Sequence, residues 1–179
     1  MKSYDIDPIV VSNNSTNITD LLVDRVAANP KLPLFATEQA DGTWHDISAE
    51  EFLAQVTAVA KGLIASGIQP GQAVAIMSKT RYEWTLIDFA IWFAGAISVP
   101  IYESSSPTQM NWILSDSDSV AVFLETEEHL ERFESIKASV PLARQVWRLD
   151  QGVIELLSQR GHDIDDETLE QRRTRAGLY

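Results

Sequence analysis

Two hydroxyl-rich segments of the sequence carry residue types that could bind a phosphate group. Ser78-Lys79-Thr80 directly follows a short apolar run and is the better candidate, because a phosphate loop ends in Lys followed by Ser or Thr. It lacks the flanking glycines that let backbone N–H groups approach a phosphate closely. Ser104-Ser105-Ser106-Pro107-Thr108 contains neither Gly nor Lys. We therefore interpret the first segment as a cap between a strand and a helix, and the second as a loop that ends in a helix cap.

One acidic segment has part of the spacing of a calcium-binding loop. Asp116, Asp118 and Glu127 fall at the first, third and twelfth places of an EF-hand loop, where calcium ligands are needed. The sixth place, which requires Gly for its sharp turn, is Ala121. An apolar run over residues 120–124 is typical of a buried strand. The strand interpretation is therefore favoured over a calcium site.

The histidines and the missing cysteines limit the catalytic chemistry further. His45, His129 and His162 stand apart in sequence, without a His-x-x-x-His or His-Glu-x-x-His pair, so each is interpreted as an ordinary surface or turn histidine. With no cysteine, thiol catalysis, disulfides and cysteine zinc sites are excluded. No Gly-x-Ser-x-Gly nucleophile elbow is present. The chain thus carries no self-sufficient catalytic constellation.

The elements that would position these residues begin with a helix and a hairpin. Apolar residues at helical spacing predict a helix from Ile18 to Asn29, which Pro30 ends. The segments 34–37 and 43–47 flank Asp41-Gly42, a strong signal for a hairpin turn in which both central residues need positive φ. We therefore predict a small β-hairpin after the first helix.

A second helix follows the hairpin. Ser48 and Glu51 have the spacing of a capping box, in which each side chain satisfies a free backbone N–H group. Gly67 supplies the left-handed C-terminal stop, and Pro70 follows just beyond it. The apolar face of this helix is predicted to contain Phe52, Val56, Val59, Ala60, Leu63 and Ile64.

The rest of the chain alternates short apolar strands with helices. The predicted strands are 73–77, 97–101, 120–124 and 145–149, and the predicted helices between them are 81–94, 107–114 and 127–138. Such alternation implies right-handed βαβ crossovers and a parallel sheet with helices on both faces. The predicted fold class is therefore α/β with a mostly parallel sheet, preceded by the hairpin, and the apolar helix around Trp84 is expected to pack on the sheet.

Charge and composition exclude several classes of function. The 179 residues are 45% hydrophobic, with 14 Lys and Arg against 26 Asp and Glu, which gives a net charge of −12 and a pI near 4.5. Such a surface repels phosphate backbones, so we expect no nucleic-acid binding. The sequence shows no signal-peptide pattern and no run of the ~20 apolar residues that a membrane span needs. We expect a soluble, cytoplasmic protein.

Three segments are expected along the chain. Residues 1–16 are polar and irregular and are interpreted as a flexible N-terminal segment. Residues 17–150 are interpreted as an α/β subdomain. Residues 151–179 are interpreted as a helical segment, ending in a surface helix with acids first and bases last, that leads to a missing remainder.

An ordered series of short stretches resembles a known enzyme family. The series runs from Trp44-His45-Asp46-Ile47-Ser48 through Gly67-Ile68-Gln69-Pro70-Gly71 to Ser115-Asp116-Ser117, and it resembles the N-terminal part of adenylate-forming enzymes, the acyl-CoA synthetases and AMP-dependent ligases. Glu83-Trp84-x-x-x-Asp88 and Val99-Pro100-Ile101-Tyr102 look most like bacterial long-chain fatty acid–CoA ligases. The resemblance implies an incomplete N-terminal subdomain of the adenylate-forming fold.

The resemblance also implies a reaction. In this family a fatty acid carboxylate attacks ATP to form an acyl-adenylate and pyrophosphate, and coenzyme A then displaces AMP. The parent enzyme would thus use ATP, Mg²⁺ and coenzyme A. The family's phosphate loop and its catalytic lysine have no counterpart among these 179 residues. No catalytic residue is therefore assigned, and the chain alone is expected to be inactive and to bind none of these cofactors.

Two residues match family positions next to a substrate surface. Arg81 and Trp84, at the start of the predicted helix 81–94, are candidate substrate-binding residues, although packing and capping of that helix is the favoured interpretation of both. Two alternatives stay open: a non-catalytic α/β interaction module, and a fragment of a ligase that loads a carrier protein. A homo-oligomer and peripheral membrane contact of the parent enzyme are further expectations.

Overall fold

The structure, a computed structural model, describes residues 16–175, so the predicted N-terminal segment lies almost entirely outside the described residues. The helices are α1 (Ile18–Ala28), α2 (Ala49–Ala65), α3 (Tyr82–Phe93), α4 (Pro107–Asp116), α5 (Glu127–Ile136), α6 (Val153–Arg160) and α7 (Asp166–Arg175). The strands are β1 (Pro33–Glu38), β2 (Trp44–Ser48), β3 (Ala73–Met77), β4 (Ile97–Ile101), β5 (Ala121–Leu124) and β6 (Gln145–Arg148).

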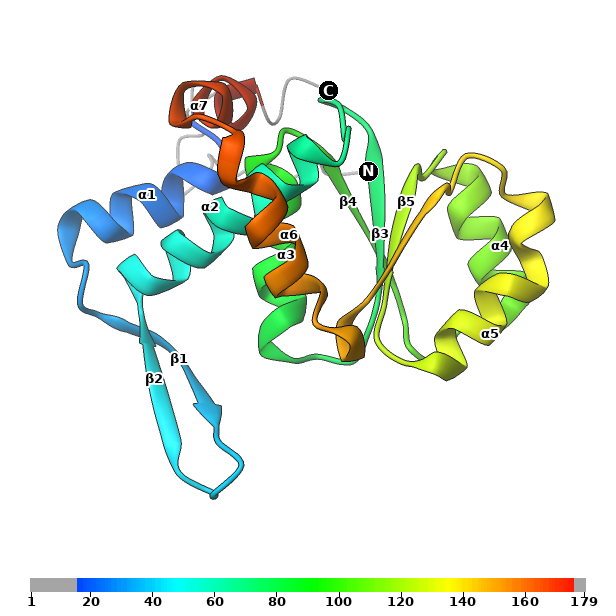
Figure 1. The fold of residues 1–179 in the computed structure, drawn as a ribbon, viewed down its shortest axis with the longest axis horizontal. Coiled ribbons are helices and arrows are strands. Elements are labelled where there is room, and N and C mark those ends of the chain that lie inside the picture. Colours follow the sequence, from blue (N-terminus) through cyan, green and yellow to red (C-terminus); the bar gives the residue numbers. More distant parts are fainter. Residues whose placement is uncertain (1–15, 176–179) are drawn as a thin grey trace, which may run out of the picture.

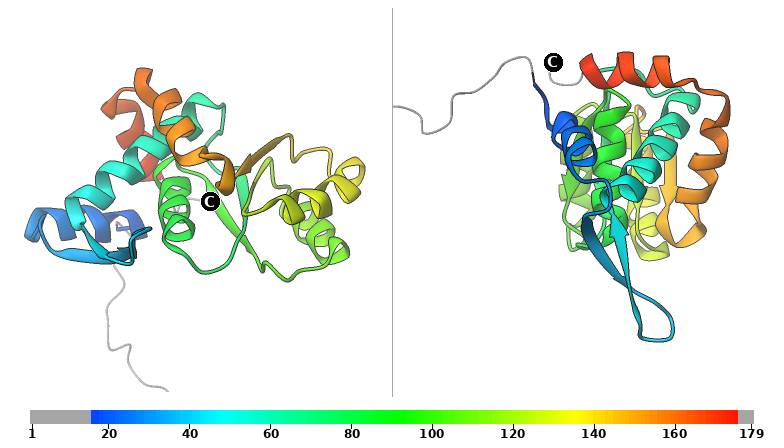
Figure 2. Two further views of the ribbon diagram at one scale, coloured as in Figure 1. Left: turned by 60° about the horizontal axis from the view of Figure 1, so that its bottom comes forward. Right: turned by 90° about the vertical axis from the view of Figure 1, so that its left-hand side faces the viewer.

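The centre of the molecule is a four-stranded parallel sheet in the order β4-β3-β5-β6. Helices α2 and α3 cover one face of it, and α4 and α5 cover the other (Figure 1). The predicted α/β class, with a parallel sheet between two helical layers, is confirmed. The hairpin β1–β2 extends away from this body (Figures 1 and 2).

The alternation of side chains along β3 explains why the core has two halves. Val74 and Ile76 belong to the apolar cluster under α2 and α3, whereas Ala75 and Met77 belong to the cluster under α4 and α5. Successive side chains of a strand point to opposite faces, so a strand buried on both faces must be apolar at every position. All five residues of β3 are buried, as the continuous apolar run predicted.

Helix α2 forms as its sequence predicts. The Ser48 hydroxyl accepts a hydrogen bond from the Glu51 N–H, and the Glu51 carboxylate accepts one from the Ser48 N–H at 2.8 Å. At the other end Gly67 has φ of +92°, and the Ile68 N–H donates to the Leu63 carbonyl at 3.1 Å. All six predicted core residues of the helix are buried.

The hairpin is present, but its turn differs from the prediction. Gly42 has φ of +81°, whereas the φ of Asp41 is not positive. The Gly42 N–H donates to the Gln39 carbonyl at 2.9 Å, and the Gln39 N–H donates to Thr43 at 2.7 Å. These bonds close a three-residue loop with glycine at its last position, in which only the glycine needs positive φ. The expectation that both central residues need positive φ was therefore wrong.

The C-terminal helices pack against the body instead of lying loosely on its surface. Leu157 of α6 is fully buried against α2. In α7, which the sequence predicts as a surface helix, Leu169 and Arg173 are 6% and 7% exposed. Arg173 reaches Thr19 and Asp20 of α1. The chain therefore closes back onto its first helix.

The outer surface of the described part has two further features. Within residues 16–175, the sheet strands β4 and β6 have no partner on their outer sides. No helix among these residues is long and apolar enough to cross a membrane.

Candidate functional site

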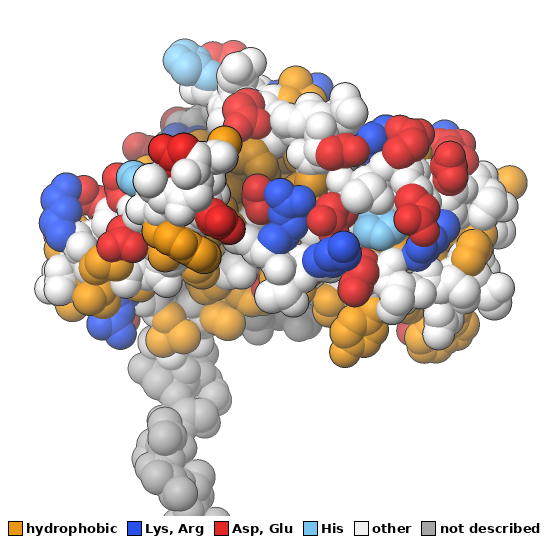
Figure 3. Space-filling view, turned by 90° about the horizontal axis from the view of Figure 1, so that it is seen from below, with side chains coloured by type: hydrophobic (Ala, Val, Ile, Leu, Met, Phe, Trp, Pro, Cys, Tyr) orange, Lys and Arg blue, Asp and Glu red, His pale blue; other side chains and the backbone are white. Residues whose placement is uncertain are grey.

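The order of the strands places the switch point of the sheet between β3 and β5. The chain leaves β3 to form β4 on one side and then crosses back to form β5 on the other side. In open α/β sheets ligands bind at such a switch point, outside the carboxyl ends of the strands. Figure 3 looks onto this end of the molecule and shows basic and acidic side chains close together at its centre. The residues that follow β3, β4 and β5 are therefore the candidate site.

An open pocket of about 310 Å³ lies beside the ends of β3 and β4. Its lining combines a half-buried indole from Trp84 with the hydroxyl groups of Ser78 and Thr80. Tyr102, at the rim, is 83% exposed. The rest of the lining is Pro100, Ile101 and Glu103. The pocket offers a flat aromatic wall with a few polar groups at one end.

A cluster of charged groups lies next to the pocket. The Glu125 carboxylate accepts hydrogen bonds from the Lys79 N–H at 2.8 Å and from the Ser78 hydroxyl at 3.3 Å. The Arg81 guanidinium lies 3.3 Å from Glu125 and donates twice to Glu83, at 2.7 and 2.9 Å. Burial alone would raise the pKa of Glu125, but the Lys79 N–H and the Arg81 charge outweigh it and lower that pKa.

This geometry corrects the interpretation of Ser78-Lys79-Thr80. The segment does connect a strand to a helix, as predicted, but α3 has no side-chain cap at its N-terminus. The Ser78 hydroxyl and the Lys79 N–H bind Glu125 instead. The segment therefore binds a carboxylate that lies far away in the sequence and does not cap the helix.

The two candidate substrate-binding residues lie in different surroundings. Trp84 lines the pocket, whereas Arg81 lies in the charged cluster with Glu83 and Glu125. Sequence reasoning did not single out Glu125, although its place directly after the apolar run of β5 is a signal that could have found it.

The histidines are only partly as predicted. His45 and His162 are exposed. His129 is 5% exposed, and its Nδ1 atom is buried without a hydrogen-bond partner. It lies one helical turn before the fully buried Phe133, on the face of α5 that packs on the sheet. The expectation of a surface or turn histidine was therefore wrong for His129.

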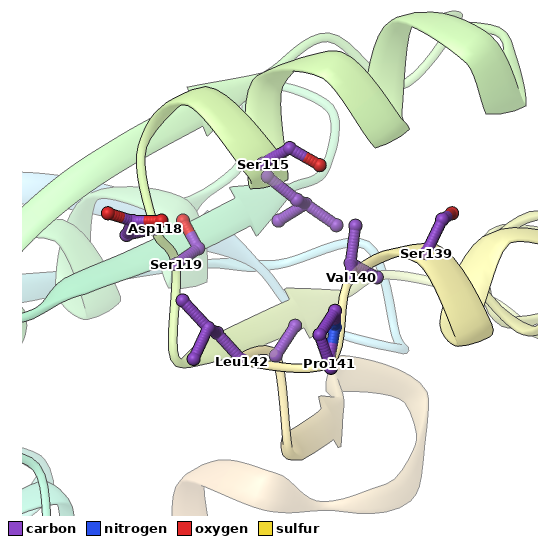
Figure 4. Close-up of a pocket in the computed structure, with 9 residues that line it drawn as sticks. Ser115, Asp118, Ser119, Ser139, Val140, Pro141 and Leu142 are labelled. Atoms are coloured by element: carbon purple, nitrogen blue, oxygen red, sulfur yellow. The ribbon is translucent and has the colours of Figure 1, made fainter.

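The metal-ligating side chains of the described residues do not gather into a cluster. Within residues 16–175 no group of three or more His, Asp or Glu side chains could hold one. The strand that was favoured over a calcium loop is present as β5. Asp118 instead has φ of +50° and, with Ser119, lines one side of a pocket of about 230 Å³ opposite Val140 and Pro141 (Figure 4). The described residues thus form no ligand cluster for the Mg²⁺ that the resemblance implies.

Comparison with known proteins assigns the chain to a family. Residues 22–175 match the family described as AMP-binding enzyme. The chain belongs to the AMP-binding enzyme family. It is 41% identical over 135 residues to the long-chain-fatty-acid–CoA ligase FadD15 of Mycobacterium bovis, a match that covers 74% of this chain and 22% of that enzyme. It is 24% identical over 174 residues to the long-chain-fatty-acid–CoA ligase ACSBG2 of Xenopus laevis, covering 92% of this chain and 23% of that enzyme.

Solved structures of AMP-binding enzymes share the fold. The N-terminal domain of FACL13 from Mycobacterium tuberculosis matches with a TM-score of 0.67 and 23% identity, over 83% of this chain and 36% of that one. The anthranilate CoA ligase AuaEII matches with a TM-score of 0.71 and 19% identity, over 83% and 28% of the two chains. The resemblance to bacterial long-chain fatty acid–CoA ligases is confirmed, as is the expected fold. The chain spans about a fifth of the length of the curated relatives that it matches.

Proposed function

We propose that this chain is part of an AMP-forming long-chain fatty acid–CoA ligase, which joins a fatty acid to coenzyme A through an acyl-adenylate made from ATP. The observation that carries the proposal is the 41% identity over 135 residues to a long-chain-fatty-acid–CoA ligase. The family match over residues 22–175 supports the use of ATP. The chain's own part in the enzyme is to build the sheet and to present the pocket at the ends of β3 and β4.

The chain alone is proposed to be inactive. The charged groups at the carboxyl end of its sheet already bind one another: Arg81 pairs with Glu83 and Glu125, and Glu125 accepts from Lys79 N–H. Charge on a transferring phosphoryl group is normally neutralised by cations held at the reacting atoms. Groups that are already paired in this way supply no such neutralisation.

The test is fatty-acid-dependent ATP–pyrophosphate exchange by two proteins. The 179-residue chain is expected to give no exchange above background. A chimera, in which this chain replaces the matched segment of the Mycobacterium bovis relative, is expected to restore exchange and thioester formation, because the interfaces of close homologues are similar. The relative without that segment is the control. Exchange by the chain alone, or a folded chimera no more active than the control, would contradict the proposal.

We also propose that Trp84 contacts the fatty acid. Arg81 holds the segment Ser78-Lys79-Thr80 beside it. In the chimera Trp84→Ala is expected to raise the KM for the fatty acid at least about tenfold, because burying a large apolar side chain is worth roughly 1.5–3 kcal/mol. Trp112→Ala is the matched control, since Trp112 is 65% exposed on α4 and outside the pocket. Equal KM values for the two variants would remove the substrate role from Trp84 and leave it a packing residue.

Self-association is proposed for the 179-residue chain. Both outer strands of the four-stranded sheet lack partners among residues 16–175, and unpaired strand edges are templates for pairing with another chain. Trp44, Tyr102 and Trp112 add large exposed aromatic surfaces. Size-exclusion chromatography with light scattering is expected to show a mass above one chain that depends on concentration. A monodisperse monomer of 20.0 kDa at all concentrations would contradict it.

A further inference from the structure

A carboxylate of the chain itself lies at the switch point between β3 and β5 and binds the groups that follow β3. Glu125 follows β5 directly, and its side chain is only 12% exposed. Three different groups contact this carboxylate: the Lys79 backbone N–H at 2.8 Å, the Arg81 guanidinium at 3.3 Å and the Ser78 hydroxyl at 3.3 Å. The Ser78 hydroxyl also donates to the Lys79 carbonyl, at 3.0 Å. Ser78 is itself buried, with 5% of its surface exposed.

These donors are the set that oxyanions bind in proteins. Backbone N–H groups, hydroxyls and guanidinium groups form charge-assisted hydrogen bonds to phosphate as well as to carboxylate. Their position also matches the general rule, since the switch point of an open α/β sheet is where ligands bind. The neighbouring pocket of about 310 Å³ shares Ser78 with this cluster.

We propose that Ser78, the Lys79 N–H and Arg81 form an oxyanion cradle. The Glu125 carboxylate occupies this cradle and prevents phosphate from binding there. Two effects act together. The carboxylate takes the space and the donors, and Glu125 and Glu83 together outnumber the single guanidinium, so the cluster repels a second anion. Removing the Glu125 carboxylate would turn the cradle into a phosphate site.

The proposal goes beyond ligase activity and does not rest on it. It concerns equilibrium binding of inorganic phosphate to residues of this chain, so it holds or fails whether or not the chain forms part of a ligase. Ser78-Lys79-Thr80 follows a parallel strand, as a phosphate loop does, but it lacks flanking glycines. The proposal gives a physical reason why it needs none. The side chain of Glu125 reaches the donors from within the fold.

The experiment is a titration of the ¹⁵N-labelled 179-residue chain with inorganic phosphate at low ionic strength, following the Lys79 amide resonance. Glu125→Ala is expected to show a saturable shift, with affinity at least about tenfold higher than any binding by the parent chain, because the freed donors form charge-assisted hydrogen bonds to phosphate. Adding Arg81→Gln to this variant is expected to lower the affinity about tenfold again.

The matched control is Glu128→Ala. Glu128 is also a glutamate near the start of α5, and its side chain is 70% exposed. Its loss changes the net charge by the same amount but leaves Glu125 in the cradle. This control is expected to bind no phosphate. Glu125→Ser is titrated in the same way, so that a second small, uncharged side chain is available if the alanine variant does not fold.

Three outcomes would overturn the proposal. The first is a folded Glu125 variant whose Lys79 amide does not shift saturably with phosphate. The second is equal binding by the Glu128→Ala control, which would mean that net charge alone decides. The third is saturable binding by the parent chain that is as tight as binding by the Glu125 variant, because Glu125 would then not close the cradle.

Discussion

Gly62→Ala is expected to lower the free energy of unfolding by about 3 kcal/mol, although the same change in an ordinary helix interior stabilises by about 0.5–1 kcal/mol. The reason is the close approach of α2 and α6. A Cβ atom on Gly62 would lie 2.1 Å from the Leu157 carbonyl oxygen and 2.5 Å from its carbon. Both atoms belong to the backbone of α6, which cannot move aside as a flexible side chain can.

Urea unfolding followed by tryptophan fluorescence measures this effect. Gly42→Ala is the control, because a Cβ there meets nothing within 4 Å and the cost comes only from φ of +81°, about 1–2 kcal/mol. Gly161 belongs to the same contact, since its Cβ would lie 2.5 Å from the Gly62 nitrogen. The double variant Gly62→Ala and Gly161→Ala is therefore expected to lose less free energy of unfolding than the sum of the two single variants. A Gly62→Ala chain as stable as the parent would disprove the packing of α6 on α2.

Arg173→Met is expected to cost about 3 kcal/mol, the usual lower range for breaking a buried ion pair by removing one partner. The Arg173 side chain is 9% exposed and forms ion pairs with Asp20 of α1 and Glu170 of α7. It also donates to the Thr19 hydroxyl at 3.0 Å and lies 6.0 Å from the centre of the Phe93 ring. One side chain thus joins the last helix to α1 and α3.

The pH dependence of stability separates this ion-pair cluster from simple packing. The pKa of Asp20 is lowered mainly by the Asn17 N–H and then by Arg173, and that of Glu170 mainly by Arg173. A carboxylate whose pKa is lowered in the fold stabilises the fold fully at pH values above its ordinary pKa, which is 3.8 for Asp20 and 4.5 for Glu170. This stabilisation is lost as the pH falls from the ordinary pKa through the lowered one. Arg173→Met is therefore expected to lose less stability between neutral and acid pH than the parent.

The exposed pair of Lys137 and Glu134 is the control for these measurements. Their side chains are 57% and 49% exposed, and such surface pairs contribute roughly 0–1 kcal/mol. Lys137→Ala should leave the unfolding curve and its pH dependence almost unchanged. If Arg173→Met behaved like Lys137→Ala at every pH, α7 would not be held to α1 by this cluster.

Local features of the molecule were predictable because they depend on neighbours in sequence. The capping boxes at Ser48 and at Ser106 join residues three apart, and both form as expected. The all-apolar run of β3 required burial on both faces, and the alternation of strands and helices required a parallel sheet. The ends of the helices were harder to predict. Helix α4 continues to Asp116, two residues beyond its expected end.

The candidate site was predictable only in outline. The sequence placed Ser78, Arg81 and Trp84 after a parallel strand, where ligands bind, but it did not pair them with anything. Glu125 stands 44 residues after Arg81 and reaches it only because β3 and β5 are neighbours in the sheet. Strand order depends on the packing of the whole domain, so no local pattern reveals this pair.

The same reason separates what the sequence by itself determined from what only the tertiary structure decided. Helices, strands, the two-sided core and the hairpin follow from residue spacing, because periodicity and capping act over a few residues. The burial of His129, the backbone contact at Gly62 and the pairing of Arg173 with Asp20 depend on chain segments far apart in sequence, 153 residues in the last case. Such contacts exist only after the helices have docked on the sheet, so their chemistry is a property of the fold.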